Sequence, residues 1–211
     1  FDGYLKRYGT FAGTGITSFR MPSNLQYIAP ETFRNCEQLK TFYIGKAFRG
    51  KINYGEEGDP DTLFLYYAPI RLIQIDKENT SYQLQNEILY TRDGHILCQA
   101  LKNDNADSQL TIPSCVTEIA DGAFYRNSEF GAIEVKGSLE RIGISAFACA
   151  DVGSFYVKGG VNYLDRGSFY QSAISEWRCH GGVKKYEKSA FQDVDATNGY
   201  AIDMNAITKL Y

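Results

Sequence analysis

The side chains of this sequence that could act as nucleophiles or general bases begin with five cysteines and two histidines. Cys179 and His180 are adjacent, and a thiol beside an imidazole is the usual composition of a cysteine nucleophile and its base. In an extended strand, however, successive side chains point to opposite faces, so these two groups cannot meet. We therefore predict that Cys179 is a buried core thiol and not a nucleophile.

The remaining cysteines do not form the closely spaced sets that bind metals. No C-x-x-C occurs, and two histidines are too few for a histidine-rich site, so no metal ion or other cofactor is expected. Cys36 and Cys149 occupy similar positions in distant parts of a repeat described below, too far apart for a disulfide. Both are predicted to be reduced and buried, as is Cys179. Cys98 and Cys115 could lie close together, and whether they pair stays open.

Carboxylates offer two further kinds of chemistry. The stretch EEGDPD at 56–61 could supply calcium ligands, but it lacks the D-x-[DN]-x-[DN]-G spacing of a calcium loop. We expect an enlarged loop there, with calcium binding as the alternative. A glycosidase needs two facing carboxylates, whereas the glutamates fall at outward repeat positions where a solvated face is expected. These glutamates are Glu118, Glu134, Glu140 and Glu176.

Composition and motifs exclude several classes of function. An apolar share of 44% allows a real core, and a net charge of −3 argues against nucleic acid or an anionic membrane as partner. No apolar run approaches the roughly 18 residues of a membrane helix. G-x-S-x-G, G-x-x-x-x-G-K-[S/T] and H-E-x-x-H are all absent, so we expect no enzyme. The sequence starts at Phe1 without a leader, from which we expect a processed or trimmed chain whose targeting signal has been removed.

A unit of two small residues followed by phenylalanine returns at nearly constant spacing and must organise these side chains. The phenylalanines stand at 124, 147, 169 and 191, in steps of 23, 22 and 22 residues. The small residues would let the backbone turn closely while the ring fills the interior. We therefore predict that Phe124, Phe147, Phe169 and Phe191 are all buried in one core spine.

Other positions come into register when the copies are aligned on these phenylalanines. An alternating apolar triplet, typical of a short strand, ends four residues before a second apolar pair. The triplets stand at 19–21, 42–44, 73–75, 110–112, 133–135, 155–157 and 177–179, with an incomplete copy at 202–204. One such unit cannot bury its apolar face alone, whereas stacked units can, so the pattern predicts a solenoid with strands ~4.8 Å apart.

The sequence LTIPSCVTEIADGAF at 110–124 resembles the repeat of the BspA-like family of leucine-rich-repeat surface proteins, L-x-I-P-x-x-V-x-x-I-G-x-x-A-F. FRMPSNLQYIAPETFRNC at 19–36 resembles the same repeat down to its cysteine. Residues 73–103 resemble a second hallmark of the family, in which a strand runs into an inserted hairpin with N-x-x-Y and D-G elements. The resemblance covers about residues 16–210, although 49–71 departs from the repeat and later copies lose the proline.

We therefore predict a mainly β repeat protein, a leucine-rich-repeat-like right-handed curved solenoid of about eight 22–23-residue coils with a hairpin insertion. Residues 1–211 are expected to form a single domain. The irregular insertion is expected at 49–71 and the hairpin insertion at 76–108.

The middle residue of each triplet must point away from the core, so these residues form one outer column. Eight stacked strands would make a continuous face ~38 Å wide, of the kind that repeat proteins use for binding. Tyrosine and arginine are over-represented at binding hot spots. The candidate ligand-binding residues are Arg20, Tyr43, Gln74, Glu134, Tyr156 and Arg178, and the column also holds Thr111 and Asp203. An ordinary solvated sheet face is the alternative.

The family resemblance implies a secreted or cell-surface protein of a host-associated bacterium, with a lipid anchor through a removed leader as one form. It implies a non-catalytic binding or adhesion module whose partner is a protein or glycan on a host or neighbouring cell surface. Two alternatives stay open. One is a structural spacer or stalk of a larger surface protein, and the other is a carbohydrate-binding or carbohydrate-degrading domain.

Overall fold

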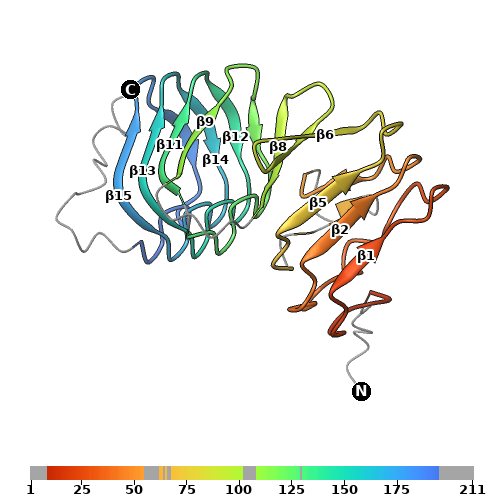
Figure 1. The fold of residues 1–211 in the computed structure, drawn as a ribbon. Helices are drawn as coiled ribbons and strands as arrows, with labels where there is room; N and C mark the ends of the chain where they lie inside the picture. Colours follow the sequence, from red (N-terminus) through yellow and green to blue (C-terminus); the bar gives the residue numbers. More distant parts are fainter. Residues whose placement is uncertain are drawn as a thin grey trace.

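The computed structural model describes residues 9–54, 62–63, 65, 68–101, 108–128 and 130–194. In that part of the chain every helix or strand is a β-strand, and the strands stack coil upon coil (Figure 1). The predicted mainly β solenoid is therefore confirmed. About seven turns are described instead of the expected eight, and the strand triplet expected at 202–204 lies outside the described residues.

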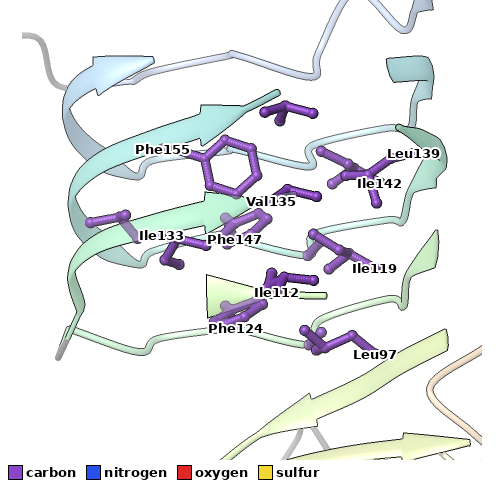
Figure 2. Close-up of a cluster of buried hydrophobic side chains, with 14 of the residues drawn as sticks. Leu97, Ile112, Ile119, Phe124, Ile133, Val135, Leu139, Ile142, Phe147 and Phe155 are labelled. Carbon is purple, nitrogen blue, oxygen red and sulfur yellow. The ribbon is translucent and has the colours of Figure 1, made fainter. Parts of the chain in front are cut away.

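The C-terminal half of the solenoid has two parallel sheets that enclose one core. One sheet, which we call the C-terminal ladder, consists of β9 (Ser108–Ile112), β11 (Phe130–Val135), β13 (Asp151–Val157) and β15 (Ala173–Cys179). The second sheet carries the short strands of the same coils, β10 (Glu118–Ile119), β12 (Leu139–Ile142), β14 (Val161–Leu164) and β16 (Val183–Tyr186). Ile133 and Phe155 from the ladder meet Ile119 and Ile142 from the second sheet in the core between them (Figure 2).

The N-terminal half carries a separate three-stranded parallel sheet, which we call the N-terminal ladder. Its strands are β1 (Ser18–Arg20), β2 (Thr41–Ile44) and β5 (Leu72–Ile75), in that order. Within the 49–71 insertion, β3 (Lys51–Ile52) pairs in parallel with β4 (Thr62–Leu63). The alternative of a calcium loop at 56–61 lies outside the described residues.

Between the two ladders the chain forms an antiparallel meander, which contains the hairpin predicted from Asp93-Gly94. β6 (Tyr82–Gln85) pairs with β7 (Ile88–Thr91), and β7 pairs with β8 (Ile96–Ala100). Gly94 has a φ of 76° in the turn between β7 and β8, a conformation that glycine adopts without strain. β8 also pairs in parallel with β10, so the meander begins the second sheet.

This meander is a shared wall between two cores. Every residue of β7 is buried. Ile88 and Tyr90 pack in the C-terminal core, whereas Leu89 between them packs in the N-terminal core. On β8, Leu97 and Cys98 divide in the same way. A strand whose alternate residues enter two different cores cannot leave either face to solvent.

The wall splits the strand face, so the expectation of one continuous array of eight strands is wrong. β5 is the last strand of the N-terminal ladder and β9 is the first strand of the C-terminal ladder. No ladder pairing joins these two strands within the described residues. The meander lies between the two halves of the molecule and separates their outer faces (Figure 1).

Hydrogen bonds of two buried asparagines connect the meander to the N-terminal half. Asn79 donates to the carbonyl oxygens of Gly45 at 2.8 Å and Phe48 at 3.2 Å, and its Oδ1 accepts from the N–H of Tyr82 at 3.0 Å. Tyr82 in turn donates its hydroxyl to the Gly50 carbonyl at 2.6 Å, which accounts for the N-x-x-Y spacing. Asn53 similarly donates to the Cys98 carbonyl oxygen of β8 at 2.9 Å.

The small residues before each phenylalanine have separate physical roles. The first of them takes a positive φ in three coils, with 57° at Gly122, 52° at Ser145 and 61° at Gly167. The second is fully buried in all four coils, so a larger side chain would have no room. These second residues are Ala123, Ala146, Ser168 and Ala190.

The predicted spine is present, with one correction at its end. Phe124, Phe147 and Phe169 are fully buried and stack with ring centroids 4.6 and 5.0 Å apart. Figure 2 shows the first two of these rings, Phe124 and Phe147. Phe191 continues the stack at 5.1 Å from Phe169 but is only half-buried, and among the described residues its ring contacts are with Phe169 and Trp177.

The cysteine predictions need one correction as well. Cys36 and Cys179 are buried free thiols, as predicted. Cys149 is only half-buried, at a corner where its backbone has a φ of 55°. Cys98 is buried and Cys115 is exposed, and both are free, so the open question of their pairing is answered by two separate thiols.

Candidate ligand-binding face

The six candidate residues of the outer column fall into two groups of three. Arg20, Tyr43 and Gln74 are register partners on β1, β2 and β5 of the N-terminal ladder. The other group, on β11, β13 and β15 of the C-terminal ladder, consists of Glu134, Tyr156 and Arg178. Each group is therefore brought together as predicted, but the two groups lie on different sheets.

On the N-terminal ladder, Tyr43 is held by two neighbours, one at its ring and one at its hydroxyl. The guanidinium carbon of Arg20 lies 3.9 Å from the ring centroid, within the range of a cation–π contact. The Tyr43 hydroxyl donates to Asp76 Oδ2 at 2.9 Å. The hydrogen bond to Asp76 raises the pKa of Tyr43. Sequence reasoning missed Asp76, although its position directly after the triplet 73–75 was the available signal.

On the C-terminal ladder, Glu134 is held between two lysines. Lys136 just beyond β11 and Lys158 just beyond β13 both form ion pairs with its carboxylate, and the Lys158 Nζ–Oε1 distance is 3.0 Å. Hydrogen bonds from Lys136 and Lys158 lower the pKa of Glu134. Arg178 pairs with Glu176 two residues earlier on β15. Tyr156 lies in register between Glu134 and Arg178 and is half-exposed.

Three basic residues form a further column beside Glu134, Tyr156 and Arg178. They were not among the candidates expected from the sequence. Lys136, Lys158 and His180 each stand two residues beyond the outward position of their coil, and all three are exposed. The available signal was the alternation itself, because residues two apart along a strand share a face. Lys136 and Lys158 add cations beside Tyr156, so the face offers an aromatic ring bordered by both signs of charge.

The outer side of the second sheet has its own network, centred on Arg141. This side chain forms ion pairs with Glu118 at 2.9 Å, Asp121 at 2.5 Å and Asp165 at 2.9 Å. Burial opposes the charged form of Arg141, but the neighbouring carboxylates of Asp121 and Glu118 still raise its pKa. Three coils are joined by one guanidinium, so this network fastens the stack together.

The candidate nucleophile and its candidate base do not come together. Cys179 is buried and donates its thiol to the Gly182 carbonyl at 3.1 Å, and burial raises the pKa of that thiol. His180 is exposed on the opposite face, as the strand alternation predicted. Among the described residues, no three metal-binding side chains gather where they could hold an ion. In that same part of the chain, no helix has the length and apolar character required to cross a membrane.

Comparison with known proteins identifies the repeat. A family model described as a BspA type leucine rich repeat region matches in six copies, over residues 7–54 and 94–198. These ranges hold well over half of the chain, and the region between them contains most of the 49–71 insertion together with the meander's first two strands. No curated protein matches the chain.

Two solved structures resemble the fold. The pneumococcal vaccine antigen PcpA superposes with a TM-score of 0.59 at 15% identity, over 83% of this chain. The chain spans 58% of the length of that structure. A leucine-rich repeat protein from Eubacterium ventriosum matches over 92% of this chain and 68% of its own length, at 16% identity and a TM-score of 0.43. At such identities, the likeness to PcpA shows the fold alone.

Proposed function

Because this chain belongs to the BspA-type leucine-rich-repeat family, we propose that it is a non-catalytic module that binds a macromolecule through its C-terminal ladder. Repeat solenoids present wide, continuous surfaces and bind other proteins in general. The partner is a protein or glycan on a host or neighbouring cell surface. A secreted or surface location is part of the proposal, and it is supported by the description of PcpA as a vaccine antigen.

The observation that carries this proposal is the ordered row of Glu134, Tyr156 and Arg178. These side chains stand on adjacent coils at the ~4.8 Å spacing of parallel strands, so one partner can touch all three. Glu134 and Arg178, the charged neighbours of Tyr156, are each held by an ion pair before a partner binds. Side chains that are ordered in advance lose less conformational entropy on binding.

The N-terminal group is a second contact area on the same molecule. Arg20 and Asp76 hold the Tyr43 ring, so its exposed edge is presented in a fixed orientation. The meander separates this group from Tyr156, so a small ligand meets one group at a time. Contact with both groups requires a partner large enough to pass over the wall, which favours a macromolecule.

The test compares two tyrosine–cation pairs of matched composition. Surface display of the domain is first screened against matrix proteins and glycans to find a partner. Tyr156→Ala with Arg178→Ala should then weaken binding by more than ~2 kcal/mol, as expected at a hot spot. The control is Tyr163→Ala with Lys185→Ala, which are register partners on β14 and β16 of the second sheet. An equal or larger loss in the control pair would place the site elsewhere.

A structural spacer in a larger surface protein is the second candidate, and a specific observation favours it. Many outward side chains already pair within the chain, as Arg141 does with three carboxylates. A spacer needs such stiffness and no partner. It predicts that the screen yields no ligand, and that neither double substitution changes adhesion when the domain is displayed in its full-length protein.

A further inference from the structure

Three short turns connect the C-terminal ladder to the second sheet. They are residues 136–138, 158–160 and 180–182, each between a ladder strand and the next strand along the chain. Backbone hydrogen bonds join successive turns, because the Gly159 N–H donates to the Gly137 carbonyl at 3.0 Å and the Gly181 N–H donates to the Gly159 carbonyl at 2.9 Å. The turns therefore stack as the strands do and form one rim of the solenoid.

The first residue of each turn is basic and exposed. These residues are Lys136, Lys158 and His180, and we call them the basic column. The N–H of each donates to a carbonyl of the coil before it, at 3.0 Å from Lys136 to Ile112 and at 2.9 Å from Lys158 to Val135. His180 bonds to Val157 in the same way, also at 2.9 Å. The ladder register thus continues through the basic column, whose members stand on adjacent coils ~4.8 Å apart.

The basic column carries more positive charge than the paired carboxylate beside it neutralises. Glu134 pairs with both Lys136 and Lys158, so two ammonium groups share one carboxylate. Glu176, on the same face, is paired with Arg178. The two lysine side chains remain 38% and 47% exposed. An excess of positive charge on exposed side chains attracts anionic ligands.

The rim beyond the basic column is low. The other two positions of each turn are glycine, apart from Ser138. A Cβ at Gly159 would lie 2.7 Å from the Ser138 nitrogen, and one at Gly181 would lie 2.7 Å from the Gly160 nitrogen, so the close approach of the coils requires glycine there. No side chain larger than serine follows the basic column in these turns, so a long ligand can lie along it.

We propose that the basic column binds a sulfated glycan whose chain runs across the coils. Lys136 and Lys158 pair with its sulfate groups, and the His180 imidazole donates a hydrogen bond to it. Tyr156 stands in the neighbouring row of the same face, where its ring can contact the sugars. This inference rests on the proposed function, because it names the class of ligand that the same ladder binds.

The spacing and charge of the basic column favour this ligand over other anions. A single exposed ion pair contributes little, so a ligand must carry charges that repeat along the row. Duplex DNA carries one charge every ~1.7 Å, which is far denser than a column with ~4.8 Å steps beside a carboxylate. The net charge of −3 also opposes so dense a polyanion. Clustered basic side chains on a surface are a known feature of heparin sites.

The first test measures heparin binding by isothermal titration calorimetry at several salt concentrations. Lys136→Gln with Lys158→Gln should weaken binding by about tenfold and reduce its salt dependence, because two contacts that release counterions are lost. The matched control is Lys40→Gln with Lys77→Gln, which removes the same charge from two exposed lysines of the N-terminal half and should change binding little. Equal losses in both pairs would overturn the proposal. Binding of duplex DNA or of unsulfated hyaluronan as tight as that of heparin would also overturn it.

The second test uses Glu134→Gln, which frees both lysines from their shared carboxylate. Heparin affinity should rise by about threefold, the size expected from a surface ion pair, whereas a purely structural role of these pairs predicts no rise. Lys136→Arg with Lys158→Arg keeps both charges and should keep heparin binding. Unchanged or weaker binding by Glu134→Gln would refute the site.

The sulfated-glycan site and the proposed function fail in different ways. If heparin does not bind the unaltered chain, the sulfated-glycan site alone is refuted, since a protein partner can still depend on Tyr156 and Arg178. If a partner found by the surface-display screen ignores Tyr156 and Arg178, the proposed ladder site is refuted even where heparin binds the basic column.

Discussion

At the scale of single residues, the corner before each phenylalanine places the strictest demands on the sequence. A positive φ favours glycine at the first small position, and Ser145 occupies the same conformation at 52°. Complete burial limits the next position to alanine or serine. The backbone conformation and the burial both return in successive coils, so these demands recur with the repeat and can be tested by substitution.

Phe147→Ala should destabilise the protein by ~3–5 kcal/mol, the usual range for a core phenylalanine. Its ring stacks on Phe124 at 4.6 Å and Phe169 at 5.0 Å, so both contacts would be lost. Phe191→Ala should cost clearly less, because Phe191 is half-buried in the described part of the chain. Urea unfolding measures both values, and equal losses would contradict the difference between the two sites.

Glu134 predicts a pH dependence whose sign follows from its lowered pKa. A carboxyl whose pKa is lower in the folded state stabilises the fold above its unfolded pKa, and this contribution is lost as pH falls through the folded pKa. Stability should therefore decrease below about pH 4, and Glu134→Gln should reduce the slope there. Urea titrations at a series of pH values measure this slope. Identical slopes in both proteins would mean that the lysine pairs do not persist in solution.

At the scale of elements, the meander of β6, β7 and β8 takes the place of an ordinary coil between the two halves of the solenoid. Its strands bury alternate residues in two cores, so it connects the two halves through packing as well as through the chain. Asn79 and Asn53 supply the polar fastening, because each satisfies backbone groups that lie away from water. The position of the N-terminal ladder thus depends on a few buried side chains.

Asn79→Ala should destabilise the protein by about 2–4 kcal/mol, since each buried backbone group that loses its partner costs about 1–3 kcal/mol. The groups concerned are the Gly45 and Phe48 carbonyls and the Tyr82 N–H. Thr80→Ala, at the exposed neighbouring position, is the control and should change stability little. Chemical denaturation compares the two variants, and similar small effects would show that the meander is held by packing alone.

At the scale of the whole molecule, two ladders and one wall decide which surfaces can act together. The N-terminal group around Tyr43 and the C-terminal group around Tyr156 lie on different sheets, with the meander between the two halves (Figure 1). A partner that contacts Tyr156 and Arg178 need not approach Tyr43. The proposed binding face is therefore the four-stranded C-terminal ladder, with the N-terminal group as a separate contact.

The shared wall predicts that the two halves unfold together as one domain. Fluorescence of Trp177 follows the C-terminal core, whereas far-ultraviolet circular dichroism follows all strands. The two urea transitions should coincide, because β7 cannot lose either core without exposing apolar residues of the other. Separate midpoints would show two independently folding units and would contradict the expected single domain.

The sequence by itself determined the features that depend on short-range alternation and on the repeat. The triplets predicted the strands, the phenylalanine spacing predicted the spine, and Asp93-Gly94 predicted a hairpin turn. The opposite faces of Cys179 and His180 also followed from alternation alone. The strands, the turn and the opposed faces are set by neighbouring residues within one coil, and the spine follows because the same coil repeats.

Only the tertiary structure decided which outward residues share a face and how they are held. The meander packs on both sides and so divides the ladder, which no local pattern in the triplets could indicate. The contact of Tyr43 with Asp76 joins residues 33 positions apart, and Lys158 reaches Glu134 from the next coil. Such contacts depend on the strand register and on which side chains are long enough to meet across coils. Both are fixed only when the coils stack.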